Sequence, residues 1–172
     1  MADDEKKELI TTTFSVMVDN EAGVLHRIVG LFSGRGYNIE SLTVSEVDKT
    51  ERRSKITIVT NGTQQIIDQI RAQLERLVPV HRVSNLTEDG RSVQRELGLI
   101  KVNCTDDDRV ESMKIADKYS ATVVDSTPES FVFEVVGRAQ TVDKFIDLMK
   151  PLGLVDVSRT GIVAIARGGE EM

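Results

Sequence analysis

The hydrophobic pattern of this chain changes its period within one short stretch, and this change limits the folds open to it. Large apolar residues occupy alternate positions along 14–18, as in a strand with one buried face. From Val24 to Phe32 the apolar residues take the spacing of one face of a helix. A second strand is predicted for 37–44. The stretch therefore predicts a strand, a tight turn, a helix and a strand, with residues 19–23 as an exposed polar turn.

The same order of elements is predicted twice along the chain. In the first half, strands are predicted at 14–19, 37–44, 55–60 and 80–83, with one helix from Val24 that Gly34 and Gly36 end and a second helix that Thr63 caps and that reaches Leu77. In the second half, strands are predicted at 97–104, 121–124, 131–135 and 154–166, the last broken at Gly161, with helices at 106–119 and 142–149. The order is that of the split βαβ fold. We therefore predict an α+β protein with two tandem ferredoxin-like (βαββαβ) sandwiches.

Composition suggests where the two halves meet. The chain has 172 residues, enough for two small domains. Residues 1–10 are rich in charge and are expected to form a disordered tail. The predicted first domain covers 11–86, a polar linker covers 87–94, and the C-terminal domain covers 95–172.

Charge and cysteine content exclude several classes of protein. With 22 basic and 28 acidic residues the net charge is −6, which disfavours nucleic acid and anionic membranes as partners. No stretch approaches the roughly 18 apolar residues of a membrane helix. Cys104 is the only cysteine, so no internal disulfide forms, and a reducing, cytoplasmic setting is expected. Cys104 is either a small buried residue or, less often for such a residue, a reactive thiol.

Two sandwiches of this size are expected to associate. Units this small bury a limited core, and the edges of their sheets remain unpaired. Pairing two copies edge to edge would resolve both problems. The sequence therefore predicts a homodimer.

No catalytic residue or metal ligand is predicted. His26 and His81 have no second ligand at a metal-binding spacing. Asp106–Asp108 lacks the glycine and distal glutamate of a calcium loop, and its charge suits a helix N-terminus. An acylphosphatase-like hydrolase on the same sandwich stays open as an alternative, with Arg35 between two glycines as its nearest phosphate-binding candidate.

A binding site is predicted at the first strand-to-helix turn. Such a turn presents free backbone N–H groups and the positive end of the helix dipole to a carboxylate. Gly23 leaves room for that approach, although it could equally be a plain turn glycine. Asn38 carries a donor and an acceptor that suit the ammonium and carboxylate of an amino acid. Asn20 could do the same or could simply cap the helix.

Several motifs resemble one known family. They are NEAGVL at 20–25, GLFSGRGYNIESL at 30–42, QLERLVPV at 73–80, RELGLIKV at 95–102 and SRTGIVA at 158–164. The first two resemble an ACT domain, and the YNIESL stretch resembles in particular the regulatory (small) subunits of acetolactate synthase, also called acetohydroxyacid synthase. The resemblance covers nearly all of the chain beyond its charged tail.

This resemblance implies a noncatalytic partner of a transferase. Such small subunits activate a thiamine-diphosphate catalytic (large) subunit and confer feedback inhibition, usually by valine, in valine, isoleucine and leucine biosynthesis. The effector lies between two ACT domains of a dimer, and the matching positions here are Asn20, Gly23 and Asn38. Thiamine diphosphate, Mg²⁺ and FAD are expected on the catalytic partner, and no cofactor is expected on this chain. Ala22 stands where many relatives have proline, and His26 where a small residue is frequent. The alternative is an ACT-type amino-acid sensor that regulates a different enzyme.

Overall fold

The computed structural model describes residues 8–87 and 92–169. The chain forms two compact units. Unit 1 comprises the chain up to Val93 together with the segment from Ala164, and unit 2 runs from Gln94 to Val163.

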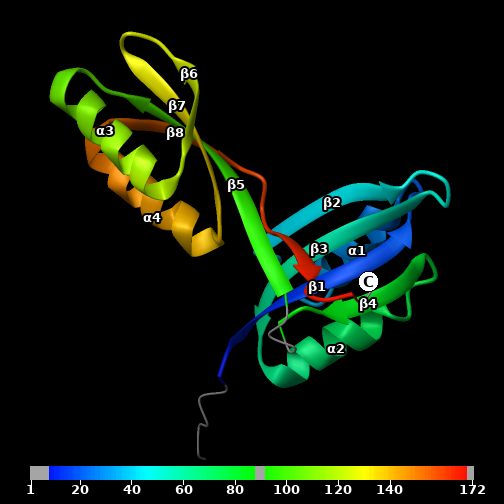
Figure 1. The fold of residues 1–172 in the computed structure, drawn as a ribbon. Helices are drawn as coiled ribbons and strands as arrows, with labels where there is room; N and C mark the ends of the chain where they lie inside the picture. The colour runs from blue at the N-terminus through cyan, green and yellow to red at the C-terminus, as the bar shows by residue number, and fades with distance from the viewer. Residues whose placement is uncertain (1–7, 88–91, 170–172) are drawn as a thin grey trace, which may run out of the picture. The chain divides into compact units, whose positions relative to one another are not determined.

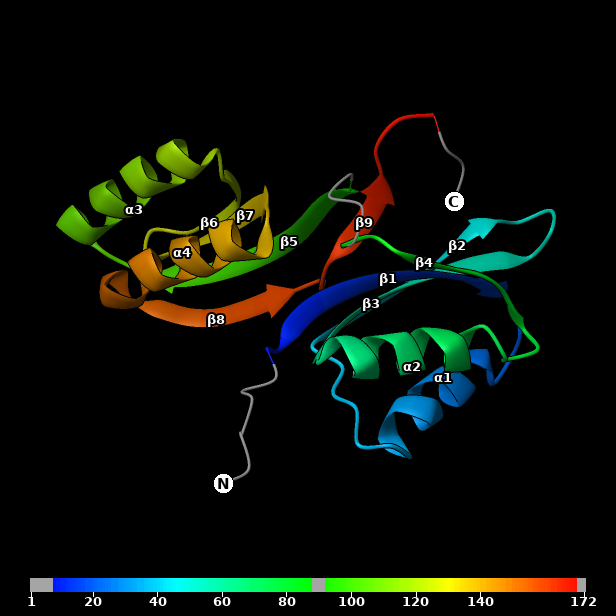
Figure 2. The same ribbon diagram turned by 90° about the horizontal axis from the view of Figure 1, so that it is seen from below.

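Unit 1 contains one four-stranded antiparallel sheet with two helices on one face (Figures 1 and 2). Its elements are β1 (Ile10–Asp19), α1 (Val24–Ser33), β2 (Ser41–Asp48), β3 (Arg53–Gly62), α2 (Gln64–Leu74) and β4 (Val80–Asn85). The strand order is β2-β3-β1-β4, so β2 and β4 are the edges. This is the predicted ferredoxin-like arrangement. As predicted, the Thr63 side chain caps α2, accepting from the Ile66 N–H at 3.4 Å.

The core of unit 1 lies between the sheet and the helices. Alternate residues of β1 and β3 point to the helices because successive side chains of a strand face opposite ways. The fully buried members include Phe14 and Val16 of β1, Ile56 and Ile58 of β3, Ile28 and Phe32 of α1, and Ile67, Ile70 and Leu74 of α2. Residues 164–169 lie on the other side of the sheet (Figure 2).

The second strand begins later than the sequence predicts. The prediction of a strand from Tyr37 is wrong, because β2 starts at Ser41. Gly36 has a positive φ of 69°, and the Tyr37 N–H returns to the Phe32 carbonyl at 3.0 Å, which closes the end of α1. Asn38 therefore lies in a connection and not in the sheet.

Unit 2 repeats the architecture. Its elements are β5 (Ser92–Asn103), α3 (Asp106–Tyr119), β6 (Thr122–Ser126), β7 (Ser130–Gly137), α4 (Ala139–Met149), the 3-10 helix η1 (Lys150–Leu152) and β8 (Leu154–Arg159). The strand order is β6-β7-β5-β8, and β9 (Val163–Ala166) also pairs with β5. The predicted break at Gly161 separates β8 from β9, and Gly161 has a positive φ of 79°.

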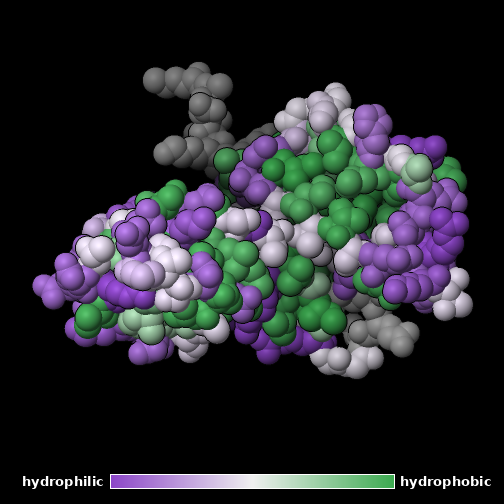
Figure 3. Space-filling view, turned by 90° about the horizontal axis from the view of Figure 1, so that it is seen from above, coloured by the Kyte–Doolittle hydropathy of each residue, from purple (hydrophilic) through white to green (hydrophobic). Residues whose placement is uncertain are grey.

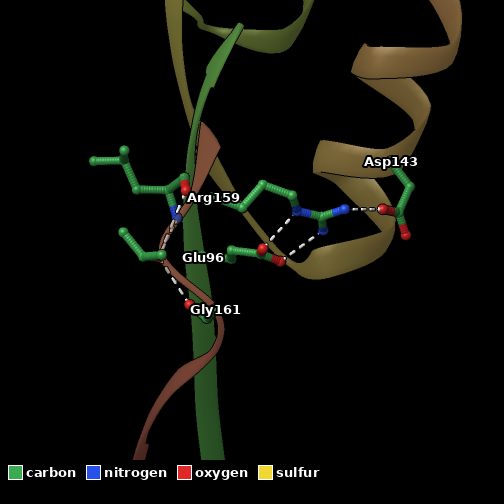
Figure 4. A network of polar contacts seen from close by, with 6 residues as sticks. Glu96, Asp143, Arg159 and Gly161 are labelled. Carbon is green, nitrogen blue, oxygen red and sulfur yellow. Dashed lines mark hydrogen bonds and ion pairs between the residues drawn. The ribbon is translucent and has the colours of Figure 1, made fainter. Parts of the chain in front are cut away.

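An ion-pair network fastens three elements of unit 2 (Figure 4). The Arg159 guanidinium of β8 donates to both carboxylate oxygens of Glu96 on β5, at 2.6 and 2.8 Å, and to Asp143 of α4 at 2.6 Å. The Glu96 side chain is only 5% exposed. The hydrogen bonds that the Arg159 guanidinium makes with Glu96 raise the pKa of Arg159 above its usual value. The network holds β8 and α4 against the central strand.

Two of the predicted domain ends fall within strands of the structure. Most of the predicted tail and residues 88–91 of the predicted linker lie outside the described residues. Ile10, placed in the tail, is the first residue of β1 and pairs with Gly62. Ser92 and Val93, placed in the linker, begin β5. The segment from Ala164, placed in the C-terminal domain, groups with unit 1.

Candidate functional site

The turn between β1 and α1 leaves backbone donors free. Gly23 is the N-cap of α1 and adopts the left-handed conformation, with φ 87° and ψ −7°. No side chain in the described part of the chain caps the helix, and its first turn carries no acidic residue. Among the residues described, the N–H groups of Leu25 and His26 have no acceptor. Together with the helix dipole, these donors form a place where a carboxylate can bind.

Gly23 has a conformation that other residues rarely adopt. A Cβ built on it would meet no atom within 4 Å, so the space over the turn is open. Its φ of 87° is strained for any residue with a side chain. Glycine is therefore required here by the backbone, and the open space is available to a ligand.

Asn20 does not cap α1, so the interpretation of Asn20 as a plain N-cap is wrong. Its backbone N–H donates to the Arg52 carbonyl at 2.7 Å, and its side-chain Nδ2 donates to Glu46 Oε1 at 3.0 Å. Asn20 is thus tied to the β2–β3 hairpin, and its side chain lies at the end of β2.

The residue before Asn20 is fixed by the other edge strand. The Asp19 N–H donates to the Pro79 carbonyl at 2.9 Å, and the Asp19 carboxylate lies 2.6 Å from Nε2 of His81 on β4. The start of the turn is therefore held on both sides, by β4 and by the β2–β3 hairpin. His81, considered above only as a metal ligand, has this supporting contact instead.

Asn38 precedes the other end of β2. Its carbonyl accepts from the Thr60 hydroxyl at 2.6 Å, and its Nδ2 donates to Glu40 Oε1 at 2.5 Å. Glu40 Oε1 also accepts from Asn61 Nδ2 at 3.1 Å. The carboxamide of Asn38 is thus held by a neighbouring glutamate, as that of Asn20 is.

The two asparagines lie at opposite ends of the sheet. Asn20 follows Asp19, which pairs with Arg53 at the start of β3. Asn38 lies beside Thr60, close to the end of β3. Seven residues of strand at roughly 3.3 Å each separate these ends by about 23 Å. One chain therefore brings Asn20 and Gly23 together but places Asn38 far from both.

Sequence reasoning missed the two glutamates that hold the asparagines. Glu46 is 26 positions from Asn20, and only the fold brings them together. Glu40 lies two residues after Asn38, and the sequence contains it within the YNIESL stretch. That proximity was the one available signal.

A hollow of about 490 Å³ occupies the matching turn of unit 2. It lies where β5 leads into α3, and its lining includes Cys104, Asp108 and Glu129. Asp106–Asp108 form the first turn of α3, as the sequence predicts for acidic residues at a helix N-terminus. Their charge opposes a carboxylate, so this turn lacks the anion-binding character of its counterpart in unit 1.

Other candidate chemistry finds little support. Within 8–87 and 92–169, no group of three or more His, Cys, Asp or Glu residues could hold a metal ion. In the same part of the chain, every helix is too short or too polar to cross a membrane. Cys104 is 4% exposed with Sγ 3.7 Å from the Ser112 hydroxyl, which favours the buried over the reactive interpretation. Arg35 follows the C-terminal end of α1, where the helix dipole disfavours a phosphate.

Comparisons with known proteins decide the family. The profile of an "AHAS small subunit-like ACT domain" matches residues 14–82, and that of the "Small subunit of acetolactate synthase" matches residues 95–168. A probable acetolactate synthase small subunit of Archaeoglobus fulgidus is 41% identical over 92% of this chain and 98% of its own length. The chain belongs to the acetolactate synthase small subunit family. The predicted family and the ACT domain are thereby confirmed.

Further members of the acetolactate synthase small subunit family agree over both units. The isozyme 3 small subunit of Escherichia coli is 38% identical, covering 92% of this chain and 96% of that protein. The crystal structure of the acetolactate synthase small subunit from Thermotoga maritima superimposes with a TM-score of 0.84 at 32% identity, covering 94% of this chain and 99% of that one. The family membership supports a regulatory role and implies a catalytic large subunit as the partner.

Proposed function

We propose that this chain is a noncatalytic regulatory subunit that activates the catalytic subunit of acetolactate synthase. It confers feedback inhibition by a branched-chain amino acid, with L-valine as the first candidate. The observation that carries the proposal is the separation of Asn38 from Asn20 and Gly23. A site that uses all three residues needs a second copy of the chain.

A dimer joined along β2 supplies that second copy. β2 is an edge strand, and its Val44 and Val47 are 42% and 51% exposed. Figure 3 looks onto unit 1 from the β2 side and shows hydrophobic residues gathered over this part of its surface. An unpaired apolar edge favours pairing with another strand.

A two-fold axis through the middle of β2 would pair the strand antiparallel with its copy. The start of β2 in one chain then lies beside the end of β2 in the partner. Asn38 precedes the start, and Asn20 is bonded to Glu46 near the end. Each dimer thus holds two equivalent sites, built from the Asn20–Gly23 turn of one chain and Asn38 of the other.

The parts of this site suit a free amino acid. The open N–H groups at the start of α1 bind the carboxylate, and the carboxamides of the two asparagines bind the ammonium group. An effector that touches both chains stabilises one dimer arrangement. The catalytic subunit responds to the extent that it binds the two arrangements differently, a coupling that is typically about 1 to 3 kcal/mol.

The chemistry belongs to the catalytic partner in this proposal. Thiamine diphosphate, Mg²⁺ and FAD are held there, and this chain supplies no cofactor site. The alternative, a sensor of a different enzyme, is disfavoured because both units match the same small subunit family. A reducing, cytoplasmic setting stays a prediction.

The test is valine titration of the complex with the catalytic subunit, comparing the wild type with Asn38→Ala. The wild type should bind L-valine and not D-valine, and should lose acetolactate synthesis as valine rises. Asn38→Ala should lose the response to valine while still activating the catalytic subunit, because Asn38 does not belong to the core. The matched control is Gln140→Ala, an exposed amide of α4 in unit 2. Loss of activation together with valine sensitivity would argue against a separate effector site.

A further inference from the structure

Both asparagines of the proposed effector site are held in the same way. Asn20 Nδ2 donates to Glu46 Oε1 at 3.0 Å, and Asn38 Nδ2 donates to Glu40 Oε1 at 2.5 Å. Glu46 lies near the end of β2, and Glu40 directly precedes its start. Two exposed carboxylates, at the two ends of one strand, thus accept hydrogen bonds from the amide nitrogens of the two asparagines.

These pairings fix which way each carboxamide points. An ionised carboxylate can only accept hydrogen bonds, so the amide nitrogen and not the amide oxygen faces each glutamate. Within the described residues, neither Oδ1 of Asn20 nor Oδ1 of Asn38 has a donor. Each asparagine therefore leaves its amide oxygen as an acceptor that an ammonium group can satisfy, and the second N–H of its Nδ2 as a donor.

The two glutamates converge if the proposed dimer forms, and the inference rests on that proposed function. Pairing β2 with its copy brings Asn38 and Glu40 of one chain beside Asn20 and Glu46 of the other. One pole of the site then has two carboxylates and two amide oxygens, and the start of α1 provides the N–H groups of the other pole. This arrangement complements the two charges of a zwitterionic amino acid.

We infer that Glu40 and Glu46 are positioning residues that turn the amide oxygens of Asn38 and Asn20 toward the effector and so select a free α-ammonium group. The class of ligand is an unmodified α-amino acid. A 2-hydroxy acid of the same shape has an uncharged hydroxyl in place of the ammonium, so the site should discriminate strongly against it.

Calorimetric titration of the complex with the catalytic subunit tests this inference. The two probes are L-valine and (S)-2-hydroxyisovalerate, and the variants are Glu40→Ala, Glu46→Ala and Glu46→Gln. Each alanine variant should weaken valine binding about tenfold or more, because a hydrogen bond to a charged group is lost. The hydroxy acid should be affected less, so the preference for valine falls. Glu46→Gln keeps an acceptor for Asn20 and should lie between the wild type and Glu46→Ala.

The control is Glu75→Ala at the C-cap of α2, which removes an exposed glutamate paired with Arg71 and should leave both ligands unaffected. Two results would overturn the positioning role while the proposed function stands. One is wild-type valine affinity in both alanine variants. The other is an equal loss of affinity for both ligands, as a purely structural role would give. Absence of valine binding by the wild-type complex would instead overturn the proposed function.

Discussion

Single residues decide whether the turn between β1 and α1 can receive a ligand. Gly23 combines a left-handed backbone with open space where a side chain would project. In this conformation a Cβ is strained by the chain's own backbone and not by a neighbour. The effect of a substitution at Gly23 on stability can therefore be measured separately from its effect on ligand binding.

Gly23→Ala should lower the free energy of unfolding by about 1 kcal/mol, the cost of a left-handed alanine. It should also weaken valine binding, because the turn either bears a methyl group or leaves its conformation. Urea unfolding and valine titration measure the two effects. Gly168→Ala is the matched control, since Gly168 has a φ of 91° and no atom within 4 Å of a built Cβ. Equal valine affinity in both variants would contradict a role for Gly23 in the site.

Residue types were easier to predict than their partners. The sequence pointed to Asn20, Gly23 and Asn38, and the structure places the first two at one turn. The sequence could not show that Glu46 accepts a hydrogen bond from Asn20, because that contact depends on how the β2–β3 hairpin meets the end of β1. Asn20 was a plausible helix cap by spacing alone, but Gly23 takes that position.

At the scale of elements, alternation and helical spacing predicted the order of strands and helices in both units. The errors occurred where hydrogen bonds end an element. Tyr37 and Ile39 continue an apolar alternation, yet the backbone of Tyr37 is used to close α1. The period of side chains cannot reveal such a closure, because it is made by a backbone group.

The ion-pair network of unit 2 is the element-scale feature that is most open to test. Arg159→Met should lower the free energy of unfolding of unit 2 by about 2 to 4 kcal/mol, because it leaves the buried Glu96 carboxylate without its cation. Urea unfolding followed by Tyr119 fluorescence, with Tyr37 changed to Phe in all proteins, reports on unit 2.

Two further variants complete this test. Lys150→Met removes the exposed pair with Asp147 and should change stability by less than about 0.5 kcal/mol. Glu96→Met combined with Arg159→Met should recover part of the loss, since no charge is then left buried. An Arg159→Met protein as stable as Lys150→Met would show that the network contributes nothing beyond a surface pair.

At the scale of the whole molecule, the family could be predicted from motifs that span both units, and the comparisons confirm it over nearly the full chain. The sequence could not predict whether the residues of the candidate site come from one chain or from two. A sequence gives positions in one chain and does not say which copy of the chain each position serves. The distance between Asn20 and Asn38 along β3 supports the proposal that they serve different sites of a dimer.

This separation has a consequence for inheritance. If each effector site takes Asn20 from one chain and Asn38 from the other, a mixed dimer of Asn20→Ala and Asn38→Ala chains concentrates both defects in one site and leaves the second intact. Two alleles that each abolish feedback inhibition should therefore complement one another when coexpressed. Valine inhibition should return to part of the enzyme population, whereas coexpression of either allele with itself restores none. Failure of the mixed population to regain any valine response would argue against an effector site shared between the two chains.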